Sequence, residues 1–135
     1  MRMNEHDQHC KAIADELLKV VNGELYTTED GDEIDTARID PSVLDEYLER
    51  MEAEPVTMWE YFSDCLDVDY LIDSNFDYKG VRVLVTCGGP NIYVSTITGK
   101  VELYWWTDRG EFYLEREVID SIDEVFSEYY EMNRL

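Results

Sequence analysis

Positive charge is scarce in this sequence. The 135 residues include 11 Lys and Arg against 32 Asp and Glu, so the formal net charge is −21 at pH 7. A surface with this charge repels nucleic-acid phosphates and anionic membranes, and it attracts basic surfaces from a distance. We therefore expect no direct contact with nucleic acid or membrane. We expect instead a strongly basic protein partner or a habitat of high salt.

Long apolar runs and paired cysteines are lacking as well. The segment MRMNEHDQHC at the start contains no apolar core of a signal peptide. No run approaches the roughly 18 apolar residues that span a bilayer. Cys10, Cys65 and Cys87 are odd in number and widely spaced, which favours reduced thiols over a disulfide framework. Together these absences predict a cytoplasmic protein.

Catalytic motifs are also missing. The loop Gly88-Gly89-Pro90 has neither the GxxxxGK[ST] nor the GxGxxG spacing of a phosphate-binding loop, and Pro90 lacks an amide donor. Nothing resembles a nucleophile elbow or the local signature of a papain-type cysteine. Carboxylates are so numerous that no catalytic pair stands out. The sequence therefore predicts a non-enzymatic protein that needs no cofactor.

Two clusters suggest metal sites, and both lack part of the required pattern. A calcium loop beginning at Asp30 would need an oxygen ligand at position five, glycine at six and glutamate at twelve. The residues at those positions are Ile34, Asp35 and Pro41. His6, His9 and Cys10 could meet one ion on a helix. Zinc needs four ligands, or three and a water, and no second cluster matches these residues, which lie near a terminus. We therefore predict no metal site.

Apolar residues are plentiful enough to build a core, because 44% of the chain is hydrophobic and 13% is aromatic. Their helical spacing over residues 5–22, with Gly23 after it, predicts a first helix. Residues 24–27 favour a short extended piece. Asp40-Pro41 predicts the start of a second helix that ends near residue 53. Its expected inward residues are Val43, Leu44, Tyr47, Leu48 and Met51. Thr57 is expected to cap a short third helix with Trp59, Phe62 and Leu66 on one side.

The second half of the chain changes from helical to alternating periodicity. The β-branched and aromatic stretches predict an antiparallel meander of four strands, at residues 67–73, 81–86, 91–96 and 101–106. Turns are expected at Gly88-Gly89-Pro90-Asn91 and at Thr98-Gly99. A final helix over residues 114–131 should face the sheet with Leu114, Val118, Ile119, Ile122, Val125, Phe126 and Tyr129. The sequence thus predicts one α+β domain over residues 1–135, with helices in 5–66, the sheet in 67–107 and the final helix across it.

Aromatic residues gather in the last predicted strand. Alternation places Val101, Leu103 and Trp105 on one face of this strand, and it places Glu102, Tyr104 and Trp106 on the other. One face must be core. We expect the other face to be covered too, because large aromatic side chains are usually buried, although a contact patch is the alternative.

A resemblance covers residues 57–131. The run GGPNIYVSTITGKVELYWW and the acidic helix after it are similar to small acidic proteins of bacterial phages and mobile elements. The resemblance rests on Gly88, Gly89, Pro90, Asn91, Thr98, Gly99, Tyr104 and Trp105, and it implies a fold and a mobile-element setting. If a phage encodes the protein, it would act in the cytoplasm of the host cell. In size, charge and lack of catalytic motifs the chain also resembles anti-CRISPR and anti-restriction proteins that mimic DNA.

Charge is unevenly distributed along the chain. Residues 24–54 contain twelve carboxylates against Arg38 and Arg50, a net charge of −10. Residues 74–107, most of the predicted sheet, have a net charge of +1. Uniform adaptation to salt should spread charge more evenly, so this segregation favours a specific use for the carboxylates.

Two predicted helices have carboxylates in rows. At about 100° per residue, one row falls within an arc of roughly 80° and spans about 21 Å. This acidic row consists of Glu117, Asp120, Glu124, Glu128 and Glu131. A shorter row consists of Asp45, Glu49 and Glu52, and the stretch before it adds Asp30, Asp32, Glu33 and Asp35. Like charges at i, i+4 destabilise a helix, so their repetition suggests that the field is used. A merely solvated helix face is the alternative.

These patterns predict an inhibitor that presents carboxylates in place of DNA phosphates. Its expected partner is the basic DNA-binding cleft of a host defence complex, such as a CRISPR effector or a restriction enzyme. The alternative is an acidic regulatory adaptor that binds a basic protein without displacing DNA. The sequence leaves pairing with a second copy of the chain open.

Salt dependence separates mimicry from adaptation to salt. If the acidity were an adaptation, the fold should loosen in dilute buffer, where repulsion is least screened. We expect a cooperative thermal transition at low salt instead, because the nearly neutral sheet supplies a core. Loss of the near-UV circular dichroism below about 0.1 M salt, where the Debye length is about 10 Å, would favour adaptation.

Overall fold

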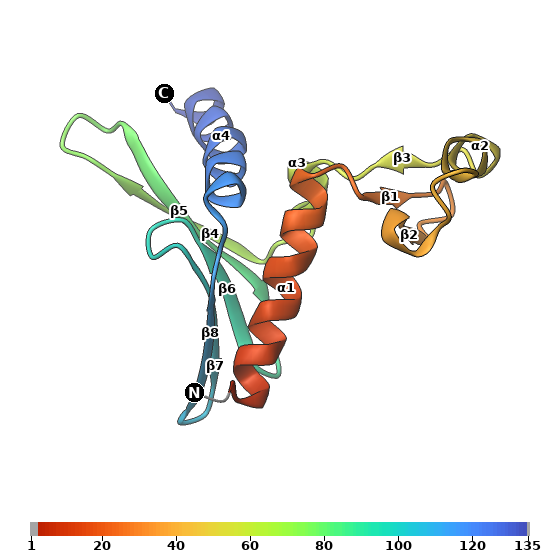
Figure 1. Ribbon diagram of the computed structural model, residues 1–135. Coiled ribbons are helices and arrows are strands. Elements are labelled where there is room, and N and C mark those ends of the chain that lie inside the picture. The colour runs from red at the N-terminus through yellow and green to blue at the C-terminus, as the bar shows by residue number, and fades with distance from the viewer. Residues whose placement is uncertain (1–2, 135) are drawn as a thin grey trace.

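The computed structural model describes residues 3–134 and has a central antiparallel sheet with the two long helices on one face (Figure 1). The helices are α1 (Glu5–Val21), α2 (Leu44–Arg50), α3 (Met58–Tyr61) and α4 (Arg116–Asn133), with a 3-10 turn at Thr36–Arg38. A small sheet contains β1 (Leu25–Thr27), β2 (Glu33–Asp35) and β3 (Glu54–Pro55). The large sheet contains β4 (Asp67–Ile72), β5 (Tyr78–Thr86), β6 (Asn91–Ser95), β7 (Lys100–Trp105) and β8 (Asp108–Tyr113). The α+β class and the C-terminal helix are confirmed.

Helix α1 begins and ends where local chemistry dictates. The Asn4 side chain accepts a hydrogen bond from the amide of Asp7 at 2.7 Å, and the Asp7 carboxylate accepts one from the amide of Asn4 at 3.3 Å. After the helix, Gly23 adopts a φ of +70°, which favours glycine. The buried face of α1 contains Cys10, Ala14, Leu17 and Val20. The predicted first helix is therefore confirmed.

The large sheet is a meander of five strands in the order β4-β5-β6-β7-β8. The prediction of four strands, with the sheet ending at residue 107, is wrong because β8 was missed. Strand β8 has the sequence DRGEFY, whose charged residues and central glycine give little alternating signal. It pairs with β7 along its whole length, from Lys100 opposite Tyr113 to Trp105 opposite Asp108.

Helix α1 lies very close to β8, and Gly110 makes this approach possible. A Cβ atom at Gly110 would lie 2.5 Å from the carbonyl carbon of His6, which is far inside van der Waals contact. Next to it, the amide of Glu111 donates to the Asp7 carboxylate at 2.9 Å. The first turn of α1 therefore covers this edge of the sheet and satisfies one of its exposed amides.

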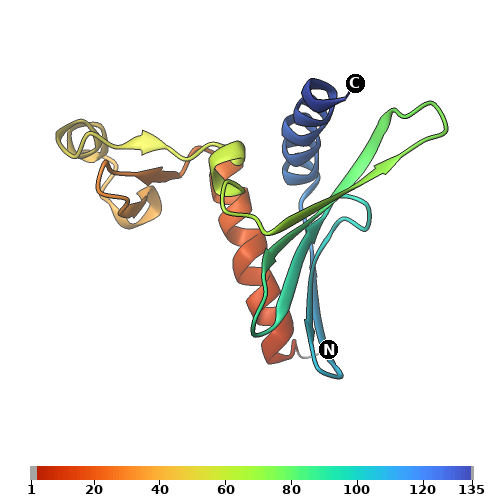
Figure 2. The same ribbon diagram turned by 180° about the vertical axis from the view of Figure 1, so that it is seen from behind.

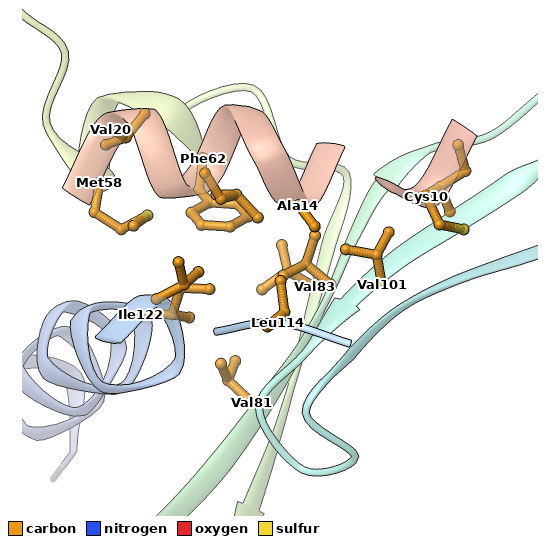
Figure 3. Packing of buried hydrophobic residues seen from close by; sticks show 14 of the residues in the cluster. Cys10, Ala14, Val20, Met58, Phe62, Val81, Val83, Val101, Leu114 and Ile122 are labelled. Carbon is orange, nitrogen blue, oxygen red and sulfur yellow. The ribbon is translucent and has the colours of Figure 1, made fainter. Parts of the chain in front are cut away.

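The core lies between the sheet and the helices. Figure 3 shows Ile122 of α4 pointing toward Met58 and Phe62. The sheet contributes Val81, Val83, Ile92, Val94, Val101 and Leu103 to the same cluster, all at most 1% exposed. Each such side chain contributes about 1.5–3 kcal/mol by leaving water. The predicted inward positions Val101 and Leu103 are confirmed, but Trp105, which was expected on the same face, is 37% exposed.

Helix α4 covers the opposite end of the same face from α1. It begins at Arg116, two residues after the predicted start, and Leu114 is buried just before it. Val118, Ile122 and Phe126 are buried, while Ile119 and Val125 pack partly against the core. Tyr129 was expected to face the sheet, but its side chain is 40% exposed.

Residues 25–55 form a lobe that projects from the end of α1, as both views show (Figures 1 and 2). Its sheet has the order β2-β1-β3. The extended piece expected at residues 24–27 is confirmed as β1, but β2 and β3 were not expected, so the helical assignment of 5–66 is wrong here. The second helix does not start at Pro41, because residues 40–43 form a turn closed by a hydrogen bond from the amide of Val43 to the carbonyl of Asp40 at 3.1 Å, and Val43 has a non-helical φ of −118°. Helix α2 is therefore only seven residues long.

Several predicted core residues face solvent. In the lobe Val43 and Met51 are exposed, and Leu44, Tyr47 and Leu48 are half-buried, because the small sheet offers little apolar surface to cover them. On α3 the cap by Thr57 is confirmed, and Phe62 is buried, but Trp59 and Leu66 are exposed. Trp106 is 88% exposed because it occupies the turn between β7 and β8 and not the strand.

Among residues 3–134, no helix has both the length and the apolar character needed to cross a membrane.

The close contact at Gly110 gives a test of the packing of α1. Gly110→Ala should lower the free energy of unfolding by about 1–3 kcal/mol, because the new methyl group overlaps the backbone of His6. Gly89→Ala is the matched control, since its Cβ would meet only the Trp105 ring at 3.9 Å. The control should change stability by less than about 1 kcal/mol in urea titrations. Equal stability of the two variants would show that α1 is not held against β8.

Candidate functional site

The acidic row lies on the solvent face of α4. All five of its members are exposed: Glu117, Asp120, Glu124, Glu128 and Glu131. They are opposite the buried residues Val118, Ile122 and Phe126, as the helical spacing predicts. The packing of one face of α4 therefore fixes the direction in which the carboxylates point.

Two of the five carboxylates in the row have an ion-pair partner. Arg116 pairs with Asp120 at 3.4 Å, and Arg134 pairs with Glu131 at 3.3 Å. In the part of the chain that the structure describes, Glu117, Glu124 and Glu128 have no ion-pair partner. Glu124 and Glu128 lie one helical turn apart, so their like charges repel. A bound cation would relieve this repulsion.

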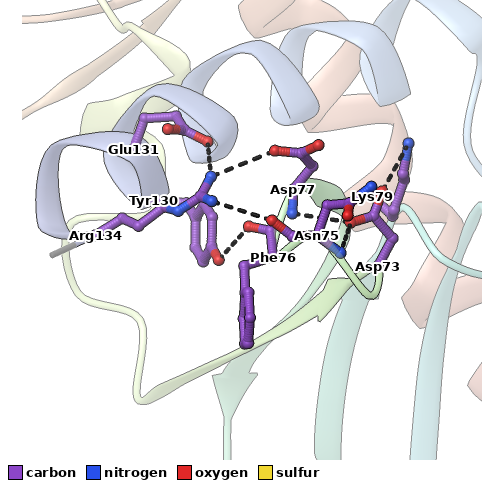
Figure 4. Close-up of polar contacts among 8 residues, drawn as sticks. All are labelled: Asp73, Asn75, Phe76, Asp77, Lys79, Tyr130, Glu131 and Arg134. Carbon is purple, nitrogen blue, oxygen red and sulfur yellow. Dashed lines mark hydrogen bonds and ion pairs between the residues drawn. The ribbon is translucent and has the colours of Figure 1, made fainter.

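A polar network fixes the C-terminal end of α4 to the turn between β4 and β5 (Figure 4). The Tyr130 hydroxyl donates to the carbonyl of Phe76 at 2.6 Å. Arg134 donates to the carbonyl of Asn75 at 3.1 Å and to the Asp77 carboxylate at 3.3 Å. Within the turn, the Asp73 carboxylate accepts from the amides of Asn75 and Asp77. These hydrogen bonds fix the C-terminal end of the helix that presents the acidic row.

One carboxylate of α4 has a structural role that sequence analysis missed. The Tyr78 hydroxyl donates to Asp123 at 2.6 Å, which joins β5 to α4. Burial, and then the adjacent Asp123 carboxylate, raises the pKa of Tyr78. Position 123 lies between the acidic row and the buried stripe of α4. Helical spacing alone therefore predicted neither an exposed nor a buried position for Asp123.

The carboxylates predicted in the lobe have different surroundings. Asp30, Asp32 and Glu33 are exposed. Asp35 is half-buried and pairs with Lys19 of α1. The hydrogen bond from Lys19, followed by that from the amide of Ala37, holds the pKa of Asp35 below its ordinary value. Asp35 therefore joins the lobe to α1 and is poorly placed to contact a partner.

The shorter predicted row is not a helical row. Asp45 and Glu49 are exposed on α2, one turn apart. Glu52 lies beyond the helix, which ends at Arg50, and it has a φ of 51°. The prediction that all three share a helix face is wrong, because α2 ends before position 52. The lobe and α4 also lie apart, with α1 and α3 between them in both views (Figures 1 and 2).

Two grooves flank α1 near the lobe, and carboxylates line both. One has a volume of about 460 Å³ and includes Asp15 and Lys19, while the other has about 630 Å³ and includes Glu60 and Asp64. Glu16 and Glu33 line both grooves. Burial, and then the charge of Glu33, raises the pKa of Glu16. These grooves suit cationic groups better than anionic ones.

The histidine and cysteine cluster near the N-terminus does not come together as a metal site. Within residues 3–134, no group of three His, Cys, Asp or Glu residues is arranged to hold an ion. Cys10 is fully buried in the core, where burial raises the pKa of its thiol to about 11. His6 lies 3.7 Å from Asp108, and His9 is exposed.

Comparison with protein-family models found no matching family, and comparisons with curated proteins and with solved structures found no significant match. The resemblance to phage and mobile-element proteins therefore stays a prediction.

The Lys19–Asp35 pair predicts a pH-dependent contribution to stability. The lowered pKa of Asp35 means that this contribution is present above the ordinary value of 3.8 and is lost as the pH falls through the folded-state pKa. Asp35→Asn should lower the free energy of unfolding at pH 7 by about 0.5–1 kcal/mol, a modest amount because Lys19 is 37% exposed and screened by solvent.

Asp15→Asn provides the control, because it removes the carboxylate of the more exposed Lys11–Asp15 pair on the same helix. Its effect at pH 7 should be smaller. Denaturant titrations from pH 7 to pH 2.5 should show the deficit of Asp35→Asn disappearing at the acid end. A deficit that persists there would mean that packing, and not charge, causes it.

Proposed function

We propose that the protein is a non-enzymatic inhibitor that offers carboxylates in place of DNA phosphates. Its partner would be a basic DNA-binding protein, and a host defence complex such as a CRISPR effector or a restriction enzyme is the class we favour. The observation that supports this proposal is the acidic row of α4, which is exposed along its length and fixed in direction by the buried side of the helix.

The linear charge density of the row is about two thirds of that of one DNA strand. Five carboxylates lie over about 21 Å of helix, or one per about 5 Å. One DNA strand has one phosphate per about 3.4 Å along the axis. Lysine and arginine side chains are long and flexible enough to adjust to this difference. A cleft built to bind a phosphate strand can therefore bind this face of α4.

Charge also supplies the driving force for association. The net charge of −21 steers the protein toward basic surfaces, and this steering weakens as salt rises. Binding to a DNA-binding cleft would release the ions held near its lysines and arginines, as DNA binding does. The lobe, with its exposed Asp30, Asp32 and Glu33, extends the same field to a second part of the surface.

The adaptor alternative is supported by a different observation. Arg116 and Arg134 pair with Asp120 and Glu131, which interrupts the acidic row and, among the described residues, leaves Glu124 and Glu128 as its only two neighbouring carboxylates without an ion pair. A short stretch suits a local contact with a basic protein that leaves its DNA site free. Competition with duplex DNA separates the two functions, because only a mimic is displaced by it.

Neutralising the centre of the row tests the proposal. Asp120→Asn combined with Glu124→Gln and Glu128→Gln removes three charges with little change in size. Affinity for a DNA-binding protein captured from host lysate should fall about tenfold or more, and its salt dependence should become shallower. Stability should hold or rise, because repulsion at i, i+4 is relieved.

A matched variant removes three carboxylates from the lobe: Glu29→Gln, Asp30→Asn and Asp32→Asn. It controls for net charge, and loss of affinity in this variant alone would move the contact to the lobe. Unchanged affinity and salt slope in both variants would contradict mimicry. Binding that persists in saturating duplex DNA would favour the adaptor.

A further inference from the structure

A mainly apolar groove lies directly beside the acidic row. It has a volume of about 350 Å³ and is lined by Trp59 of α3 and by Val125, Glu128, Tyr129 and Met132 of α4. The side chains of Trp59, Tyr129 and Met132 are 46%, 40% and 76% exposed. Large apolar groups that stay together in water on a small protein mark a contact surface more often than isolated ones do.

The groove is formed before any partner arrives. Helix α3 is capped by Thr57, whose hydroxyl accepts from the amide of Glu60 at 3.1 Å. The Trp59 ring then packs against two rings of α4, with centroids 4.9 Å from Tyr129 and 6.1 Å from Phe126. Because packing already orders these rings, binding of a partner side chain would cost little conformational entropy in the groove residues.

Negative charge borders the groove along α4. Glu128 lines the groove, and Glu124 lies one helical turn before Glu128. The nearby cation Arg134 is already engaged by Asp77 and Glu131. An occupant must therefore bring an apolar side chain into the groove and positive charges to its rim.

We infer that this groove holds an apolar anchor, such as leucine or phenylalanine, from a basic amphipathic helix of the partner protein. Lysine or arginine residues beside the anchor would meet Glu124 and Glu128. The inference rests on the proposed function and adds to it, because a phosphate mimic alone needs no apolar contact. Charge sets the rate of encounter, and a desolvated anchor slows dissociation.

Two other occupants fit less well. A nucleic acid would bring phosphates against Glu124 and Glu128. A second copy of this chain would place the same acidic rim against itself, and each copy has a net charge of −21. A basic helix avoids both sources of repulsion.

A pair of synthetic peptides tests the inference. The first is a helical peptide of about 18 residues with leucines on one face and lysines on the other, and the second has alanine in place of every leucine. Fluorescence anisotropy at about 0.15 M salt should show the leucine peptide binding at least about tenfold more tightly. The difference measures the apolar contact, because the lysines are the same.

Variants then locate that contact. Tyr129→Gln combined with Met132→Gln should reduce the preference for the leucine peptide to near unity and leave binding of the alanine peptide unchanged. Met51→Gln is the matched control, because Met51 is an exposed methionine of the lobe, and it should keep the full preference. Circular dichroism and thermal melting check the fold. Met132→Gln alone, at a largely exposed position, serves if the double variant is unfolded.

The other possible results contradict either the groove or the proposed function. Equal binding of both peptides, or a preference that survives the double variant, would overturn the groove and leave the proposed function standing. Failure of both peptides to bind even at low salt would count against both proposals. Sedimentation at twice the mass of 15.9 kDa, abolished by the double variant, would assign the groove to self-association and overturn the inference.

Discussion

Burial of one face of α4 is the interaction on which the functional surface depends. Val118, Ile122 and Phe126 leave water against the sheet and against Phe62, and they fix the rotation of the helix about its axis. The same rotation presents the acidic row to solvent and places Tyr129 and Met132 beside Trp59. Charge and apolar contact on this side of the protein are thus two results of one packing arrangement.

A chain with so many carboxylates can fold only if the charged side chains lie away from the residues that form the core. The sheet segment of residues 74–107 has a net charge of +1, and its inner face is made of valine, isoleucine and leucine. The lobe concentrates negative charge on a part of the chain that buries only Leu25 and Ile34. Repulsion in the lobe therefore acts on few core contacts.

Sequence reasoning succeeded where one period dominates and failed where tertiary contacts decide. The stripes of residues 5–22 and 114–131 predicted both long helices and, with them, the exposure of the acidic row. Strand β8 was missed because its inner face has Gly110 against the backbone of α1, a contact with no apolar signal, and only one apolar residue, Phe112, that packs partly against the core. The groove was missed because Trp59 was expected on one side of a short helix with Phe62 and Leu66, and Tyr129 was expected to face the sheet. Only the structure shows that the Trp59 and Tyr129 rings pack together at the surface.

The hydrogen bond from the amide of Glu111 to the Asp7 carboxylate affects how the protein responds to proteolysis near the N-terminus. Asp7 takes part in the cap of α1, and its carboxylate also accepts the hydrogen bond from β8. Proteolysis that removed the first turn of α1 would remove the helix cap. It would also expose the unpaired edge of β8 to solvent. Bared edges pair with one another, so a clipped molecule would be prone to assemble edge to edge into insoluble aggregates while its acidic row remained intact.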